Sequence, residues 1–148
     1  MDGTTPTPQE MEVVIGEGNL NYTERRNIEY KLNRGLIDGV REGDEVPVDV
    51  SLEFRWEFLR ASVGEPPSVE DALKQRGEAS TWVTAGADPC EPYAVTLVVI
   101  HTPPCGGAEV ETITLGEFRW EELDHDLRAG TVSVNGKCNI RYATITRS

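Results

Sequence analysis

One stretch of the sequence, residues 46–58, alternates apolar and polar side chains without interruption and constrains the fold more than any other feature. Its apolar members are Val46, Val48, Val50, Leu52, Phe54, Trp56 and Phe58. Because successive side chains of a β-strand point to opposite faces, the pattern predicts one long strand with a buried face and a solvated face. At about 3.3 Å per residue the strand would span roughly 43 Å, a length typical of extended sheets, barrels and assemblies.

Two further stretches predict strands in different environments. Ile28, Tyr30 and Leu32 alternate with polar residues and predict a short, half-buried strand that stops at residues 33–35. Residues 93–101 are apolar at nearly every position. Strands that are covered on both faces have this composition, so we expect this one to be central and buried on both sides.

Turn residues connect the remaining strands. The Pro- and Gly-rich segment 103–107 predicts a hairpin between the strand before it and a strand at 110–118, whose extension to Leu123 is left open. A last strand is expected at 131–144. Within that strand, Asn135–Gly136 fits either a two-residue turn or a bulge.

Residues 68–77 carry the clearest helix signals. Ser68 can cap the first turn, with Asp71 in a capping-box-like position, and Lys74 and Arg76 lie near the negative end of the helix dipole. The apolar side of this helix is narrow, so we expect it to cover one edge of a sheet. The sequence therefore predicts a mainly β (α+β) fold, an antiparallel sandwich or curved sheet with one flanking helix.

Composition limits the organisation of the chain and the partners it can have. A length of 148 residues with 38% apolar residues fits one β domain over 12–148, after a polar N-terminal arm at 1–11 that we expect to be flexible. The formal net charge of −12 argues against a diffuse phosphate-binding surface. No apolar run approaches the roughly 20 residues of a membrane span, and the N-terminus lacks a secretory pattern, so we expect a cytosolic protein without membrane insertion.

Asp124-His125-Asp126 is the best candidate for a metal or acid–base site. A strand would point the two aspartates to one face and the histidine to the other, and no further group is placed to converge with them. We therefore interpret the tripeptide as an ordinary solvated corner. No phosphate-binding loop and no nucleophile motif is visible, so we expect no catalytic residues, no metal and no cofactor.

The sequence contains Cys90, Cys105 and Cys138, without a Cys-x-x-Cys pair. A strand at 93–101 would hold Cys90 and Cys105 roughly 30 Å apart, well beyond the limit of about 7 Å between the Cα atoms of a disulfide. We therefore expect buried free thiols. A disulfide from Cys138 to one of the other two cysteines is the alternative.

Several stretches, taken in their order along the chain, resemble the tail tube (major tail) proteins of long, non-contractile-tailed bacteriophages. The stretches are Ile15–Tyr22, Gly35–Val50, Ser68–Leu73, Pro89–Tyr93, Leu115–Phe118 and Gly136–Asn139. The resemblance covers about residues 12–140. No single stretch is a catalytic signature, and their order carries the match.

The resemblance implies a structural virion protein. In that family, subunits form rings, usually of six, whose inner wall is a continuous β-barrel, and the rings stack into a tube that conducts DNA. The implied partners are further copies of the chain, a tape-measure protein and the tail terminator and distal tail proteins. DNA would pass without specific binding, there would be no membrane insertion, and the protein would reside in the virion tail after assembly in the host cytoplasm.

The resemblance also assigns two groups of residues. The solvated face of the long strand would line the lumen, where acidic side chains repel phosphate and prevent sticking. Its residues are Asp49, Ser51, Glu53, Arg55 and Glu57. The long loop over residues 33–45 would reach an adjacent ring, with Leu36, Ile37 and Val40 exposed in the monomer. The loop residues assigned to this contact are Arg34, Leu36, Ile37, Asp38, Val40, Arg41, Glu42, Asp44 and Glu45.

Two other functions fit parts of the sequence. A carbohydrate-binding β-sandwich module would use a tryptophan as a stacking platform; Trp56 falls on the apolar face of its strand, whereas Trp82 and Trp120 are candidates for exposure. A small hydrolase would use Asp124 with Glu121 or Glu122. Both alternatives stay open at the level of the sequence.

Overall fold

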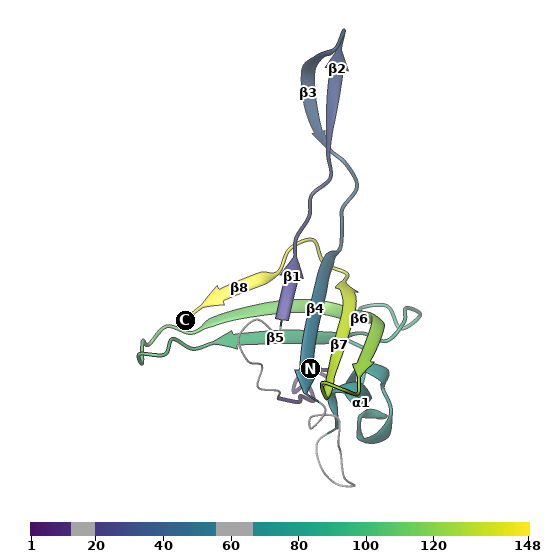
Figure 1. The fold of residues 1–148 in the computed structure, drawn as a ribbon, viewed down its shortest axis with the longest axis vertical. Helices are drawn as coiled ribbons and strands as arrows, with labels where there is room; N and C mark the ends of the chain where they lie inside the picture. The colour runs from purple at the N-terminus through teal and green to yellow at the C-terminus, as the bar shows by residue number, and fades with distance from the viewer. Residues whose placement is uncertain (13–19, 56–66) are drawn as a thin grey trace.

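The computed structural model of the chain describes residues 1–12, 20–55 and 67–148. Six strands form one antiparallel sheet in the order β1-β4-β7-β6-β5, with β8 also paired to β6, and two further strands form a separate hairpin, β2–β3 (Figure 1). The strands are β1 (Leu20–Thr23), β2 (Ile28–Asn33), β3 (Leu36–Glu42), β4 (Val48–Arg55), β5 (Val95–His101), β6 (Glu111–Asp126), β7 (Thr131–Cys138) and β8 (Thr144–Arg147). The helical elements are α1 (Val69–Lys74) and the short 3-10 helix η2 (Gly77–Ala79).

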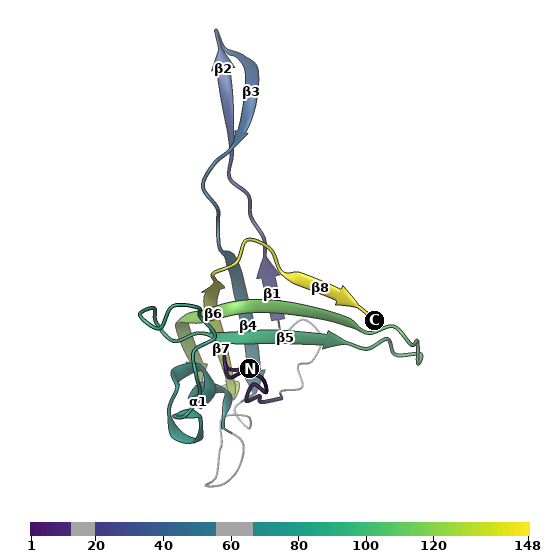
Figure 2. The same ribbon diagram turned by 180° about the vertical axis from the view of Figure 1, so that it is seen from behind.

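The sheet folds into two layers, and strand β6, with 16 residues, contributes to both of them. Its first half pairs with β5 and β8, and its second half pairs with β7. Register shifts interrupt both ladders, and Glu117 between the two halves has a positive φ of 52°. Bulges of this kind bend a strand and increase its twist. As a result β5 and the first half of β6 run across β1, β4 and β7, and the core lies between the two layers (Figures 1 and 2).

Strand β4 confirms the alternation from Val48 to Arg55, whereas Val46 and Pro47, which were expected to begin the strand, lie in the connection before it. Its even-numbered residues, Val48, Val50, Leu52 and Phe54, are buried, and the residues between them are half-buried or exposed. The core residues opposite come from β7, where Val132 and Val134 are fully buried. Residues 56–58 of the expected long strand lie outside the described residues.

Helix α1 begins as the sequence predicts. The Ser68 hydroxyl accepts a hydrogen bond from the Asp71 backbone N–H at 3.2 Å, and Val69, Ala72 and Leu73 are buried. The helix ends at Lys74, earlier than expected, because Gln75 adopts the left-handed conformation with φ of 53°. Tyr93 fastens the helix to the start of β5 by donating from its hydroxyl to the Ala72 carbonyl at 2.9 Å. Burial raises the pKa of Tyr93 to about 12.

The expectation of a central strand at 93–101 is wrong. The strand begins at Val95 and lies at the edge of the sheet, and Ile100 is 64% exposed. Only one of its faces packs on the core, through residues such as Leu97, which pairs with the fully buried Leu115. On the other face, Val98 and Ile100 are paired with threonines of β6. β-branched residues at those positions fit a solvated sheet surface as well as a core, so the apolar run did not report burial on both sides.

The C-terminal third contains two strands where the sequence predicts one. The hairpin between β5 and β6 is confirmed, and β6 extends beyond Leu123 to Asp126. The expected strand at 131–144 divides into β7 and β8. Asn135 and Gly136 lie inside β7, opposite a register shift in β6 between Trp120 and Glu122, so the irregularity belongs to the facing strand.

Hydrogen bonds connect the first residues of the chain to one another and to the body. Asp2 is buried, and its carboxylate accepts hydrogen bonds from the backbone N–H groups of Thr4, Gln9 and Val83. These bonds, together with one from the Thr4 hydroxyl, lower the pKa of Asp2 even though its burial acts in the opposite direction. A polar composition did not reveal this, because the partner at Val83 is distant in sequence. Among the described residues, no helix has the length and apolar character needed to cross a membrane.

Candidate functional site

The β2–β3 hairpin projects from the body of the molecule along its longest axis (Figures 1 and 2). The sequence predicted a loop over residues 33–45, and the structure corrects this, because Leu36–Glu42 forms strand β3 and pairs antiparallel with β2. The turn consists of Arg34 and Gly35, which both have positive φ, 52° and 81°. Turns with two such residues match the twist of the flanking strands and connect hairpins tightly.

One face of this hairpin is apolar and uncovered. Tyr30 pairs with Val40, and Leu32 pairs with Ile37, so the four side chains lie side by side on one face. They are 63%, 60%, 61% and 70% exposed, in that order. The expectation that β2 is half-buried is therefore wrong, because the hairpin has no second layer from the described residues. The expected exposure of Leu36, Ile37 and Val40 is confirmed.

Polar residues occupy the opposite face and the base of the hairpin. Glu29 pairs with Arg41, with 2.5 Å between the Glu29 Oε2 and Arg41 Nε atoms. Asp38 is the extra residue at the register shift between the ladder pairs of Lys31 and Leu32. Glu42 ends β3, and Asp44 and Glu45 lie in the connection to β4. The residues assigned to a contact loop thus divide between an apolar face, a polar face and a charged base.

The residues assigned to a lumen lie on the outer face of β4. Asp49, Ser51, Glu53 and Arg55 alternate with the buried core residues, and all but the half-buried Asp49 are exposed. Residues of β7 stand beside them, with Lys137 opposite Asp49, Asn135 opposite Ser51 and Ser133 opposite Glu53.

This outer face of β4 is polar and mixed in charge rather than uniformly acidic. Arg25 forms an ion pair with Asp49, and the Ser133 hydroxyl lies 3.4 Å from the Glu53 carboxylate. Glu57, the fifth residue assigned to the lumen, lies outside the described residues.

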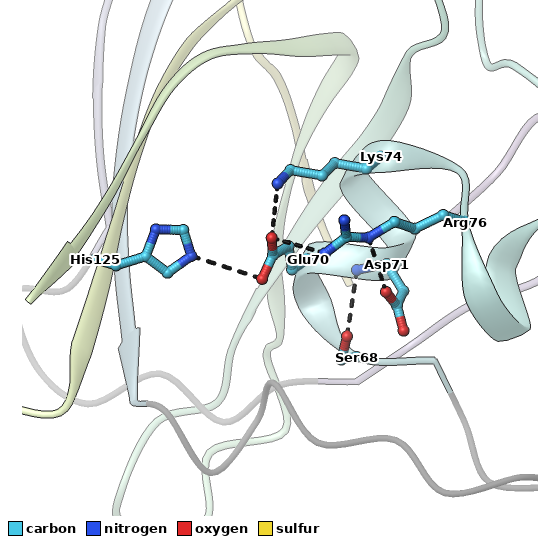
Figure 3. Close-up of polar contacts among 6 residues, drawn as sticks. All are labelled: Ser68, Glu70, Asp71, Lys74, Arg76 and His125. Carbon is cyan, nitrogen blue, oxygen red and sulfur yellow. Dashed lines mark hydrogen bonds and ion pairs between the residues drawn. The ribbon is translucent and has the colours of Figure 1, made fainter. Parts of the chain in front are cut away.

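Asp124-His125-Asp126 forms no convergent site. His125 faces α1, where its Nε2 atom lies 3.6 Å from the Glu70 carboxylate (Figure 3). Asp126 instead accepts backbone hydrogen bonds from Arg128 and Ala129 in the turn that follows β6. In the described part of the chain, no group of three or more histidine, cysteine, aspartate or glutamate side chains is arranged to hold a metal ion.

Glu70 is the centre of the charge cluster in Figure 3. Its carboxylate accepts from Lys74 Nζ at 2.6 Å and from Arg76 Nη2 at 2.8 Å, besides its contact with His125. The hydrogen bond from Lys74 lowers the pKa of Glu70 most, and the charge of Arg76 adds to the effect. The Lys74 ammonium also lies 5.6 Å from the centre of the Trp120 ring. The contacts of His125 and Trp120 join α1 to the second half of β6.

The burial of the cysteines and of the tryptophans differs in part from what the sequence predicted. Cys138 is buried as expected, and its burial raises the thiol pKa to about 12, but Cys90 and Cys105 are exposed free thiols. Trp82 is buried, and Trp120 is 38% exposed with Lys74 above its ring. Trp56 lies outside the described residues.

A cavity of about 540 Å³ opens between the N-terminal segment, α1 and β5. Its lining side chains are apolar apart from Glu10, Glu12 and Thr96. Pockets for small molecules combine an apolar lining with a few polar groups, and this cavity shares that general composition without indicating a particular ligand.

Sequence reasoning missed two arginines that bind the base of the hairpin. Arg25 pairs with Asp49, and Arg141 pairs with Glu42 and Glu45. No local pattern marks either residue, because their partners are distant in sequence and meet them only in the folded chain. Comparison of the chain with protein-family models, curated proteins and solved structures found no match.

Proposed function

We propose that this protein is a structural subunit that assembles with copies of itself into rings, six subunits being the number expected from the resemblance, and that the rings stack into a tube for DNA delivery. This is the function of the tail tube proteins that the sequence resembles. The observation that carries the proposal is the projecting hairpin with an uncovered apolar face. The protein would then be a non-enzymatic virion component, assembled in the host bacterial cytoplasm.

An exposed apolar face on a two-stranded ribbon points to a partner. Isolated two-stranded hairpins are marginally stable in water, and contiguous exposed apolar surface commonly marks a contact with another protein. Tyr30, Leu32, Ile37 and Val40 are each more exposed than buried. Docking against a second molecule would remove this surface from water and give the hairpin the second layer that it lacks.

The charge of the hairpin favours another copy of the same chain as that partner. Residues 28–42 contain three acidic and three basic side chains, whereas the whole chain has a formal net charge of −12. Two copies therefore repel each other over most of their surface, and a neutral, apolar projection is the part that can approach a second copy without this cost. A heterologous contact of this kind can build rings and open stacks.

The outer face of β4 supports the conduit half of the proposal. Its described residues are polar and mixed in charge, because Arg25 and Lys137 stand at Asp49 and Arg55 follows Glu53 on the same face. A wall whose cations lie beside carboxylates leaves less free positive charge for phosphates to bind, so DNA would pass without being retained. A tape-measure protein and the terminator and distal tail proteins complete the proposed set of partners, and contact with DNA would be transient.

Assembly of the purified protein tests the proposal directly. We expect rings or hollow tubes in negative-stain electron microscopy and a rise in light scattering over a concentration series. Ile37→Asp should abolish assembly and leave the urea midpoint of unfolding unchanged, because Ile37 is exposed in the monomer. Leu127→Asp is the matched control, since Leu127 is also exposed but lies between β6 and β7.

Each outcome of this experiment supports or contradicts the proposed hairpin contact. Tubes that form equally well with Ile37→Asp would show that the apolar face of the hairpin is not the contact. Tubes lost with both variants would indicate a general sensitivity to added charge. A strict monomer at every concentration would count against self-assembly of the chain.

A binding module is the second candidate, favoured by the partly exposed Trp120 ring. Carbohydrate-binding modules stack sugars on exposed indoles, but here Lys74 already lies over the ring. We expect Trp120→Ala to abolish any quenching of tryptophan fluorescence by oligosaccharides. Quenching that depends on Trp120, in a protein that stays monomeric, would favour the module over the tube subunit.

A further inference from the structure

One short segment of the body makes several of the contacts at the base of the hairpin. Residues 139–143 lie between β7 and β8, and they bind both connections that lead to the hairpin. The Arg141 guanidinium pairs with Glu42 at the end of β3 and lies 3.8 Å from the Glu45 carboxylate in the second connection. The Ala143 backbone N–H donates to the Glu24 carboxylate in the first connection at 3.0 Å.

Two further contacts complete this base. Arg25 of the first connection pairs with Asp49 of β4, and the Gly43 N–H donates to the Asn27 carbonyl at 2.8 Å, which joins the two connections to each other. Three carboxylates from the connections and from β3 thus meet the segment 139–143, and one arginine serves two of them. The Arg141 guanidinium also lies 5.1 Å from the centre of the Tyr142 ring.

We infer that Arg141 is a positioning residue, which sets the direction in which the β2–β3 hairpin projects through an ionic hinge with Glu42 and Glu45. The hairpin extends about 20 Å from its base, at about 3.3 Å per residue, so a small rotation at the hinge moves its apolar face by several ångströms. Exposed ion pairs contribute little to global stability, so the hinge acts on the direction of the hairpin and not on the folding of the body.

The consequence for assembly rests on the proposed function. A contact surface that is held in its bound direction before association loses less freedom on binding. Ion pairs at a solvated base weaken as salt rises, because screening shortens the reach of the charges to about 3 Å at 1 M. High salt therefore has two opposite effects, since it relieves repulsion between acidic bodies and loosens the hinge.

The hinge can be tested on the monomer, without reference to tubes. A spin label at Lys31→Cys on the polar face of β2 and a second label on the native, exposed Cys105 report the distance between hairpin and body by dipolar EPR. Cys90→Ser removes the other exposed thiol, and the buried Cys138, whose thiol stays protonated, is not labelled. Samples are dilute enough for the chain to remain monomeric.

We expect one dominant distance in this background protein. Arg141→Glu should replace the single peak by a broad distribution, because its charge now repels Glu42 and Glu45. The double variant Arg141→Glu/Glu42→Arg should restore the single peak, which a merely structural role for Arg141 would not do. Arg147→Glu is the matched control, because Arg147 of β8 pairs with Glu111 of β6 at 3.3 Å and takes no part in the hinge.

Two results would overturn the inference. One is an unchanged distance distribution in Arg141→Glu, and the other is a broad distribution that the charge-swapped double variant does not narrow. Circular dichroism and thermal melting of each variant would confirm that the body is folded. Absence of tubes from the parent protein would refute the proposed function and leave the hinge standing, so the two failures are distinguishable.

Discussion

Strand β4 and the β2–β3 hairpin have the same sequence pattern and opposite environments. Both alternate apolar and polar side chains, yet the apolar residues of β4 are buried, whereas Tyr30, Leu32, Ile37 and Val40 of the hairpin are 60–70% exposed. The difference lies in what stands opposite: β4 has neighbours on both edges and a second layer across the core, whereas β2 and β3 have only each other. Alternation thus reports that a strand has two chemically different faces, and burial depends on whether another layer covers one of them.

The largest expected difference between the two regions is in the free energy of unfolding when an aromatic residue is truncated. Phe54→Ala on β4 should cost about 3–5 kcal/mol, because it leaves a cavity in a packed core. Tyr30→Ala on the hairpin should change stability by less than about 0.5 kcal/mol, as exposed positions usually do. Urea denaturation measures both values. Equal costs would mean that the hairpin packs against the body in solution.

Glycine substitutions sharpen the comparison at the level of the backbone. A Cβ atom at Gly136 of β7 would lie 2.2 Å from the Arg119 carbonyl oxygen and 2.8 Å from the Phe118 ring, whereas nothing lies within 4 Å at Gly39 of β3. Gly136→Ala should therefore destabilise the protein by about 1–3 kcal/mol through overpacking. Gly39→Ala should be neutral or stabilise by up to about 1 kcal/mol. The melting temperature should fall in Gly136→Ala and should stay unchanged or rise in Gly39→Ala.

Removing a charged group should give the smallest difference in the free energy of unfolding between the body and the hairpin. Glu70→Gln should cost about 1 kcal/mol, because the Glu70 carboxylate is largely buried and accepts from two cations. Its pKa is lowered in the folded state, so the stabilisation is present above the ordinary value of 4.5 and is lost as the pH falls below it. Glu29→Gln on the hairpin removes an exposed pair and should cost less than about 0.5 kcal/mol. Denaturation at pH 7 and at pH 3 checks both statements, since the gap between parent and Glu70→Gln should shrink in acid.

Elements that depend on neighbouring residues were predicted well. The Ser68 cap, the alternation of β4 and the turn between β5 and β6 follow from side-chain direction, capping and turn chemistry, which act within a few residues. The strand predicted at 28–32 is also present, although the prediction that it is half-buried was wrong. The residues assigned to the two candidate surfaces lie on solvent-accessible faces wherever they are described, with Asp49 half-buried.

Other features required contacts between distant parts of the chain. The anchoring of Asp2 needs Val83, the burial of Trp82 needs the surrounding core, and the ionic base of the hairpin needs Arg141. The exposure of Cys90 and Cys105 depends in the same way on which loops the fold leaves at the surface. Local propensity contains no information on such pairs, because their members are brought together only by the topology of the sheet.

Local sequence patterns are enough to predict that this protein is mainly β, with two-faced strands, one capped helix and an acidic net charge. Those properties follow from the period of side chains along a strand, from capping and from composition. Which apolar faces are covered depends on contacts between elements that are distant in sequence. The bent strand β6 brings two layers together around β4, and the short connections at residues 24–27 and 43–47 carry β2 and β3 beyond the reach of either layer. Burial depends on a second surface in contact, which a single strand cannot specify.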